Sequence, residues 1–255
     1  MPLPLLAKAR DSGQKQRRTS MGQAGKKDTS GIDATGGAGV ASGAVASGDV
    51  ARTYGWTDSH ERESHRILLP FVEPRLREAL RPGDAVLDLG CGNGYVTSWI
   101  KKLGYAPVGV DAADDGVEVA SKGYPDIKFV RASVGDADFR AKVGGPFRAV
   151  VALEVLEHLY DPAALFARVN DVLAKDGVLV LSTPYHGYAK NLAISLLNGW
   201  DAHFHVGRFG GHVKFFSPQS LDALAKENGF RRVSFEGAGR VPWLWKSMVV
   251  TFVRT

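Results

Sequence analysis

Short apolar runs alternate with stretches of helical periodicity over the chain after residue 84. The first five runs are rich in β-branched residues and are separated by segments long enough to form helices. This pattern is typical of βαβ units around a parallel sheet that is buried on both faces. It therefore predicts an α/β fold of Rossmann-like type. The expected strands are 85–89, 106–111, 127–132, 147–153, 177–183, 231–239 and 247–255.

Two segments flank this pattern. Residues 59–80 are amphipathic but contain Pro70 and Pro74. Because proline cannot donate to the helical ladder, we expect one or two helical pieces interrupted there. Residues 185–216 leave the expected carboxyl edge of the sheet and are rich in histidine and aromatic residues, so we expect a substrate lid.

The first fifty residues differ from the rest in composition. They end in a Gly/Ala/Ser-rich stretch that cannot bury enough surface to offset its ordering entropy, so we expect a disordered tail, 1–50, and one domain, 51–255. Residues 1–30 hold seven basic and two acidic residues, which accounts for the whole formal charge of +5. The remaining chain is formally neutral, which argues against a nucleic-acid partner.

A glycine-rich turn joins the first expected strand to a helix that begins near Tyr95. Gly90, Gly92 and Gly94 allow a ligand to approach the backbone at a helix N-terminus. The dinucleotide fingerprint requires its third glycine at position 95, so the spacing disfavours NAD. Asp111 ends the second strand, where a carboxylate can accept hydrogen bonds from ribose hydroxyls.

A group of ionisable residues follows the fourth strand. Glu154, Glu157 and His158 have spacings of three and four residues, which place them on one face of a helical turn. One interpretation is that Glu154 contacts a cofactor while the other two cap a loop. The other is a site for a hard divalent cation with open positions for substrate oxygens.

The segments VLDLGCGNG, VGVD, FRAVVALEVLEH and VLVLSTP resemble the class I S-adenosylmethionine-dependent methyltransferases over roughly residues 54–255, and most of all the ubiquinone-biosynthesis O-methyltransferases. The resemblance implies a seven-stranded, mostly parallel sheet with a reversed last strand. It implies S-adenosylmethionine over the ends of the first four strands. The residues that it places at this cofactor are Asp88, Gly90, Cys91, Gly92, Asn93, Gly94, Asp111, Ala112, Ser133, Val134, Leu153 and Glu154.

The resemblance also implies a metal site, because the ubiquinone enzymes carry one on the same E-x-x-E-H pattern. Small-RNA 3′-terminal 2′-O-methyltransferases add a later histidine from a segment similar to HVKFFS, which begins here at His212. The expected ligands of Mg²⁺ or another divalent cation are therefore Glu154, Glu157, His158 and His212. Without a metal, His212 is the expected general base, assisted by His158 and Glu157.

The expected lid departs from that of the ubiquinone enzymes. His186, His203 and His205 lie within it, but a dedicated zinc site lacks a cysteine partner and an assigned third ligand. The apolar stripe of KNLAISLLNGW is expected to pack in the core, with an interfacial helix on a membrane as the alternative. We expect Trp243 and Trp245 to pack as well.

These observations together predict methyl transfer to a small-molecule acceptor, at a hydroxyl oxygen. The alternatives are 2′-O-methylation of an RNA 3′-terminal ribose and a non-catalytic subunit that binds S-adenosylmethionine. No apolar run approaches the roughly 20 residues of a membrane span. A single cysteine, Cys91, excludes an internal disulfide, so we expect a cytoplasmic protein. The oligomeric state does not follow from the sequence.

Overall fold

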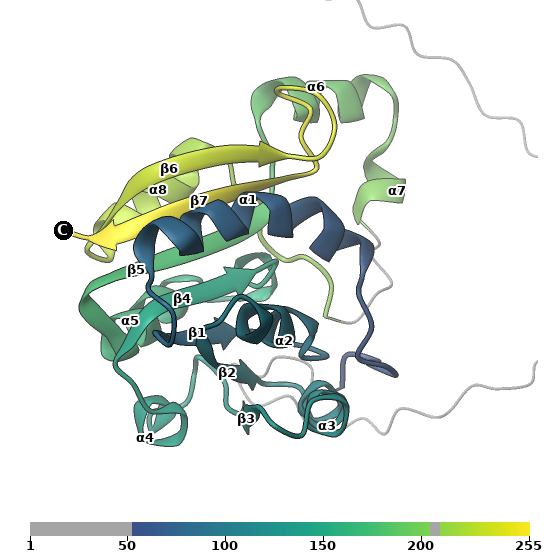
Figure 1. Cartoon of the computed structure of the whole chain (residues 1–255). Coiled ribbons are helices and arrows are strands. Elements are labelled where there is room, and N and C mark those ends of the chain that lie inside the picture. The colour runs from purple at the N-terminus through teal and green to yellow at the C-terminus, as the bar shows by residue number, and fades with distance from the viewer. Residues whose placement is uncertain (1–52, 205–209) are drawn as a thin grey trace, which may run out of the picture. The chain divides into compact units, whose positions relative to one another are not determined.

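The computed structural model describes residues 53–204 and 210–255, and its seven strands form one sheet in the order β3-β2-β1-β4-β5-β7-β6 (Figure 1). The first five strands pair in parallel, and β7 runs antiparallel to both β5 and β6. The predicted seven-stranded α/β fold is confirmed. The strands are β1 Ala85–Leu89, β2 Ala106–Asp111, β3 Lys128–Arg131, β4 Phe147–Leu153, β5 Leu173–Pro184, β6 Phe230–Ala238 and β7 Ser247–Arg254.

Helices cover both faces of the sheet (Figure 1). Residues of α1 and α2 share one buried cluster with the sheet, and residues of α4, α5 and α8 share another. None of the helices described has the length and apolar character that crossing a bilayer requires. The helices are α1 Glu63–Ala79, α2 Tyr95–Lys102, α3 Asp114–Gly123, α4 Phe139–Val143, α5 Ala163–Val172, α6 Tyr188–Leu196, α7 Trp200–Phe204 and α8 Pro218–Glu227, with a 3₁₀ turn, η1, at Leu156–His158.

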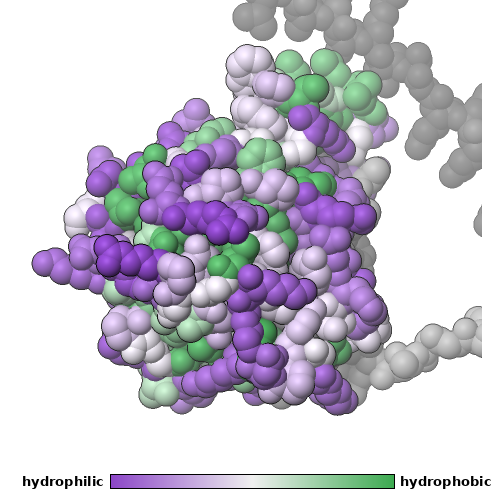
Figure 2. Space-filling model, viewed as in Figure 1, coloured by the Kyte–Doolittle hydropathy of each residue, from purple (hydrophilic) through white to green (hydrophobic). Residues whose placement is uncertain are grey.

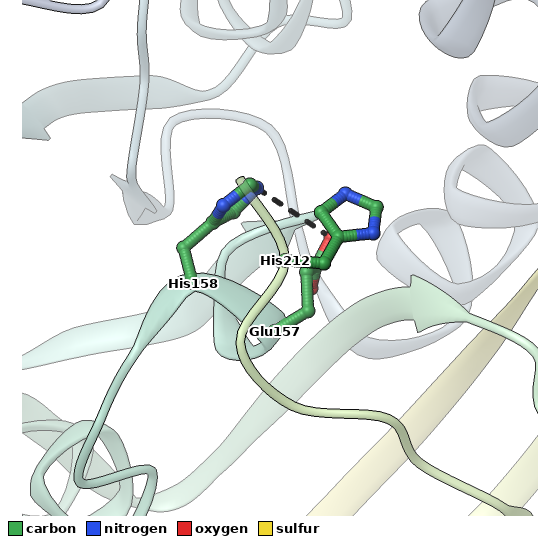
Figure 3. Close-up of side chains that lie close together, drawn as sticks. All are labelled: Glu157, His158 and His212. Carbon is green, nitrogen blue, oxygen red and sulfur yellow. Dashed lines mark ion pairs between the residues drawn. The ribbon is translucent and has the colours of Figure 1, made fainter. Parts of the chain in front are cut away.

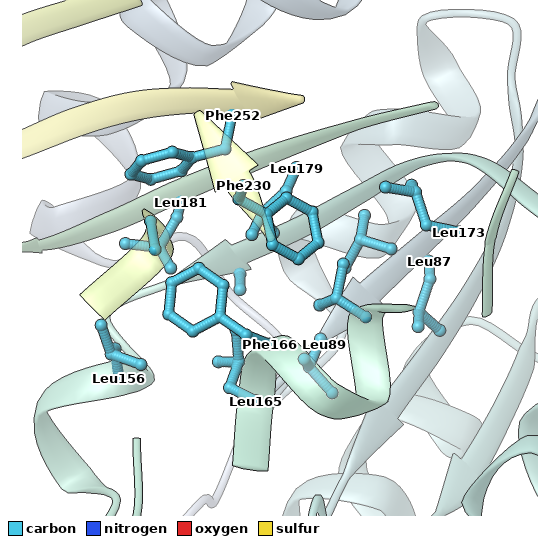
Figure 4. Close-up of a cluster of buried hydrophobic side chains, with 14 of the residues drawn as sticks. Leu87, Leu89, Leu156, Leu165, Phe166, Leu173, Leu179, Leu181, Phe230 and Phe252 are labelled. Atoms are coloured by element: carbon cyan, nitrogen blue, oxygen red, sulfur yellow. The ribbon is translucent and has the colours of Figure 1, made fainter. Parts of the chain in front are cut away.

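The two clusters follow from the alternation of side chains along each strand. In β1, Leu87 and Leu89 point into one cluster and Val86 into the other, because successive strand residues face opposite sides of the sheet. Phe166 of α5 lies at the centre of the first cluster, with its ring 5.6 Å from that of Phe230 and 6.2 Å from that of Phe252 (Figure 4). Burial on both faces explains why these strands are apolar throughout.

The expected interruption of the first helical segment is wrong. Residues 63–79 form one helix, with Pro70 and Pro74 inside it. The two prolines are four residues apart and both are exposed, so they share the solvent face. Water can satisfy the carbonyl groups that lose their helical partners on that face, while Leu69, Val72 and Leu76 keep the opposite face buried.

The parallel strands bring several loops to one edge of the sheet. The carboxyl ends of β1, β2, β4 and β5 lie side by side there, because each of these strands pairs in parallel with its neighbour. Ligands of open α/β sheets bind at this edge. The predicted tail, 1–50, lies outside the described residues, as does His205, so the tail and the domain boundary at residue 51 stay predictions.

Candidate functional site

The glycine turn after β1 has the conformation that its sequence predicts. Gly90 and Gly92 have φ of +79° and +49°, a region that residues with a Cβ rarely adopt. A Cβ on Gly90 would lie 2.3 Å from Val155 Cγ2, and one on Gly92 would lie 2.6 Å from the ring of Trp56. Both positions therefore require glycine for their conformation and for the space around them.

Asp111 connects this turn to the end of β2. Its carboxylate accepts hydrogen bonds from the amide of Gly92 and from the amide of Ala113, each at 2.8 Å. Burial raises the pKa of Asp111, although the two amides favour its ionised form. The carboxylate thus holds the turn in place, beside any part it has in binding ribose.

A cavity of about 490 Å³ lies over the glycine turn and the ends of β1, β2 and β4. Of the residues predicted to contact a cofactor, only Gly94 does not line it. Gly94 is the N-cap of α2, and a Cβ on it would lie 2.7 Å from Ala120 Cβ and 2.9 Å from the ring of Phe129. The predicted residues that do line the cavity are Asp88, Gly90, Cys91, Gly92, Asn93, Asp111, Ala112, Ser133, Val134, Leu153 and Glu154.

The sequence analysis missed the other wall of this cavity. Residues 53–62, which precede α1, contribute Tyr54, Trp56 and Arg62 to the lining. The side chain of Asn93 holds this segment by donating to the carbonyl groups of Asp58 and His60, at 3.0 and 2.9 Å. A signal was available, because Tyr54 and Trp56 are the first aromatic residues of the chain and follow directly on the tail.

Asp88, next to the last residue of β1, makes the stability of the fold depend on pH. Burial raises the pKa of Asp88 to about 7, although the hydroxyl of Thr97 donates to it at 2.6 Å and favours the ionised form. The folded-state pKa lies above the ordinary value of 3.8, so protonation of Asp88 favours the folded state. This contribution to the free energy of unfolding is fully present below pH 3.8 and is lost as the pH rises through 7.

We therefore expect Asp88→Asn to stabilise the protein relative to wild type more at pH 8 than at pH 5, with a difference on the order of a few kcal/mol. Urea unfolding of both proteins at the two pH values measures this. Asp176→Asn, on the exposed part of β5, is the control and should show no such difference. Equal effects of Asp88→Asn at both pH values would contradict the prediction.

The acidic and histidine residues after β4 do not share one helical face. Glu154 has a positive φ of 55°, and η1 begins only at Leu156. The carboxylate of Glu154 accepts from Ser182 Oγ at 2.8 Å and from Ser247 Oγ at 3.3 Å. The expectation of a common helical face was therefore wrong, because the left-handed backbone at Glu154 directs its side chain toward β5 and β7.

Glu157, His158 and His212 do come together (Figure 3). Each offers a ligand atom within 4.8 Å of those of the other two, and Glu154 is outside this group. The amides of Val213 and Lys214 donate to the carbonyl of Glu157, at 2.8 and 3.1 Å, and so hold the His212 segment against η1. Through this contact, residues more than fifty positions apart in the sequence become neighbours.

Glu157 is the buried member of the group. Its Oε2 accepts from Thr183 Oγ1 at 2.9 Å, whereas Oε1 has no hydrogen-bond partner among the described residues and lies 3.9 Å from His158 Nε2. Burial, and then the charge of Glu154, raise the pKa of Glu157 well above its usual range. An unpaired buried carboxylate oxygen that faces two imidazoles fits a divalent cation.

His186 and His203, the other histidines of the expected lid that the structure describes, form no comparable group. His186 is buried, its Nδ1 lies 3.1 Å from Asn191 Oδ1, and its ring packs edge-on against His203 with centroids 5.2 Å apart. Within the part of the chain that the structure describes, neither belongs to a set of three potential metal ligands. Trp245 packs against Tyr185 as expected, but Trp243 is exposed, so the packing prediction is wrong for Trp243.

Comparison with known proteins identifies a family profile and two similar enzymes. The profile described as "Methyltransferase domain" matches residues 60–234. The ubiquinone biosynthesis O-methyltransferase of Azorhizobium caulinodans is 31% identical over 165 residues, 62% of this chain and 64% of that protein. That of Xanthomonas axonopodis pv. citri is 29% identical over 182 residues, 69% of this chain and 74% of that protein. The match thus spans just under two thirds of the Azorhizobium protein.

Solved structures support the same fold. Magnesium protoporphyrin IX methyltransferase from Synechocystis, with bound SAH, aligns with a TM-score of 0.58 at 19% identity, covering 75% of this chain and 84% of that one. Identity this low shows the fold alone. The sequence and structure comparisons together confirm the predicted resemblance.

Proposed function

The chain belongs to the family of methyltransferase domains, and on this premise we propose that it transfers a methyl group from S-adenosylmethionine to a hydroxyl oxygen of a small-molecule acceptor. One observation carries the proposal. The cavity over the glycine turn is continuous with the ionisable residues after β4, because both Glu154 and His158 line it. A cofactor in this cavity and a base beside its methyl group are the two components that such a reaction needs.

The cofactor roles follow from position. The backbone of Gly90 to Gly92 would face the methionine part, at the turn that leads into the N-terminus of α2. The carboxylate of Asp111 would accept from the ribose hydroxyls. Ala112, Ser133 and Val134 line the part of the cavity beside the ends of β2 and β3, where the adenine would lie.

Methyl transfer is an in-line displacement. The S–CH₃ bond of the sulfonium breaks, an O–CH₃ bond forms, the sulfonium becomes a thioether, and the hydroxyl proton passes to a base. We assign that proton to Nε2 of His158, a residue that lines the cavity, and the carboxylate of Glu157 beside it would stabilise the imidazolium that forms. The low polarity around fully buried Glu157 strengthens its interaction with a positive charge on the imidazole.

The same side chains suit a cation. Glu157, His158 and His212 would hold it, and the unpaired Oε1 of Glu157 is the observation that supports this. A bound divalent cation would supply Lewis acidity that lowers the pKa of the acceptor hydroxyl. Glu154, predicted as a fourth ligand, would instead stay with Ser182 and Ser247.

Calorimetric titration tests the proposal. We expect the chain to bind S-adenosylhomocysteine at one site and not to bind NAD, because Tyr95 replaces the third glycine of the dinucleotide fingerprint. Transfer of labelled methyl groups to phenols and catechols, with an RNA oligonucleotide in parallel, then separates the acceptor classes. Methylation of RNA alone would favour the terminal-ribose alternative, and binding without any turnover would favour a non-catalytic subunit.

Peripheral membrane contact is a further part of the proposal. The stripe expected to pack in the core is instead exposed at Leu192 and Leu196 of α6 and at Leu197, which follows α6. Hydrophobic side chains gather in this region (Figure 2). The adjoining β6–β7 connection exposes Val241 and Trp243. Co-sedimentation with phospholipid vesicles measures the contact, which Leu196→Ser with Leu197→Ser should abolish. We retain the cytoplasm as the proposed location.

A further inference from the structure

The segment that closes one side of the cavity, residues 53–62, also reaches the proposed base. Tyr54 Oη lies 2.8 Å from His158 Nδ1 and donates its proton to the carbonyl of Gly210. The two rings meet edge to face, with centroids 5.6 Å apart. Tyr54 therefore contacts the imidazole on the nitrogen opposite to the one that faces Glu157.

Asp115, in the first turn of α3, fixes the backbone at Tyr54. Its carboxylate accepts from the amides of Tyr54 at 3.0 Å, Gly55 at 2.6 Å and Trp56 at 2.9 Å. Burial alone would raise the pKa of Asp115, but the amides of Tyr54, Trp56 and Gly55 outweigh it and lower the pKa. The carboxylate is ionised at neutral pH, so these are charge-assisted hydrogen bonds, which are stronger than neutral ones.

The contacts of His158 determine which of its nitrogens carries the proton. Nδ1 lies 3.3 Å from the carbonyl oxygen of Gly211, and a carbonyl oxygen can only accept. The Tyr54 hydroxyl donates a hydrogen bond to the carbonyl of Gly210, so the hydroxyl oxygen accepts a hydrogen bond from Nδ1 as well. Both contacts require a proton on Nδ1, which leaves the lone pair of the neutral imidazole on Nε2.

The consequence lies on the opposite side of the ring. Nε2 of His158 faces Oε1 of Glu157 at 3.9 Å. With its lone pair there, Nε2 can take the proton of an acceptor or share a cation with Glu157. A proton on Nε2 would instead point at the carboxylate and block both roles.

We propose that Tyr54, held by Asp115, is a positioning residue that fixes His158 as the Nδ1–H tautomer with Nε2 turned to Glu157. The inference deepens the proposed function and rests on it, because a defined tautomer matters only if His158 serves as base or ligand. A residue that hydrogen-bonds to the second nitrogen of an imidazole in this way sets the orientation and basicity of the ring.

Long-range ¹H–¹⁵N spectra of the full chain, treated with chelator and saturated with S-adenosylhomocysteine at pH 8, read the tautomer directly. The chain has seven histidines, and His158→Gln assigns the signals of interest. We expect wild-type His158 to show a protonated Nδ1 and an unprotonated Nε2. In Tyr54→Phe the signals should move toward the Nε2–H form that free imidazole side chains favour.

Tyr124→Phe is the matched control. The hydroxyl of Tyr124 also holds this segment, by donating to the carbonyl of Ser59 at 2.7 Å, but it does not contact His158. We expect wild-type tautomer signals in this variant. A second readout is Mn²⁺ affinity, which should fall about 10- to 100-fold in Tyr54→Phe and stay at the wild-type value in Tyr124→Phe.

The outcomes separate the inference from the proposed function. If wild type does not bind S-adenosylhomocysteine, the proposed function fails whatever the tautomer. If it binds, but wild-type His158 carries its proton on Nε2, or Tyr54→Phe leaves the signals unchanged, the positioning role is overturned. The wild-type spectrum alone decides the tautomer, so a proton on Nε2 of wild-type His158 overturns the proposal even if Tyr54→Phe does not fold.

Discussion

Replacing Gly90 with alanine is expected to weaken binding of S-adenosylhomocysteine by at least about 30-fold, or about 2 kcal/mol. The residue has φ of +79°, and its new Cβ would lie 2.3 Å from Val155 Cγ2. Valine is branched at Cβ and cannot rotate away at low cost, so the turn itself must move. Titration calorimetry measures the loss, because the displaced turn is the part of the backbone proposed to face the cofactor.

Gly104→Ala is the matched control for this variant. Gly104 has φ of +94°, so alanine there meets similar backbone strain, but nothing lies within 4 Å of the added Cβ. Gly104→Ala should lose about 1–2 kcal/mol of stability and keep wild-type affinity. Wild-type affinity in a folded Gly90→Ala protein would contradict the assignment of the turn.

Glu157→Gln is expected to weaken binding of Mg²⁺ or Mn²⁺ by at least about 100-fold. This exceeds the roughly 10- to 100-fold loss that is typical when a hydrogen-bond partner of a metal ligand is removed. The amide oxygen can still accept from Thr183, so the fold should persist, but the buried negative charge is gone. Affinity for S-adenosylhomocysteine should stay within about threefold of wild type. Metal titration by calorimetry and turnover in chelator with added cation measure the two effects.

Glu154→Gln tests how many carboxylates the group contains. The structure keeps the carboxylate of Glu154 on Ser182 and Ser247 and outside the group of three, so this variant should bind metal as wild type does. An equal loss of metal affinity in both variants would restore the four-ligand set expected from the sequence. Full turnover of wild type in excess chelator would exclude a required metal and leave Glu157 only its role beside the base His158.

Local sequence was sufficient for the sheet and for the glycine turn. The expected strands match the seven observed within a few residues. The match is clearest for β1, β4 and β7, where burial on both faces imposes continuous apolar runs. The turn at Gly90 and Gly92 was recognisable from the sequence because a positive φ favours glycine at the position itself, without help from distant residues. The largest difference is β5, which begins at Leu173, before the polar residues Lys175 and Asp176.

Properties that depend on distant partners could not be predicted in this way. The helical spacing of Glu154 and Glu157 suggested one face, yet hydrogen bonds to Ser182 and Ser247 accompany a left-handed residue that separates them. Pro70 and Pro74 stay within one helix because packing of the opposite face compensates for the lost hydrogen bonds.

The proposed base, His158, shows most clearly what the sequence could predict and what only the tertiary structure decides. The E-x-x-E-H pattern identified His158, and the resemblance pointed to His212, but neither indicated Tyr54 or Asp115. The tautomer of His158 depends on contacts with Tyr54 and Gly211, which lie 104 and 53 positions away along the chain. Periodicity and local spacing report only on neighbours within a turn or a strand. Such contacts exist only once folding has brought the segment before α1 and the segment before α8 to the same edge of the sheet.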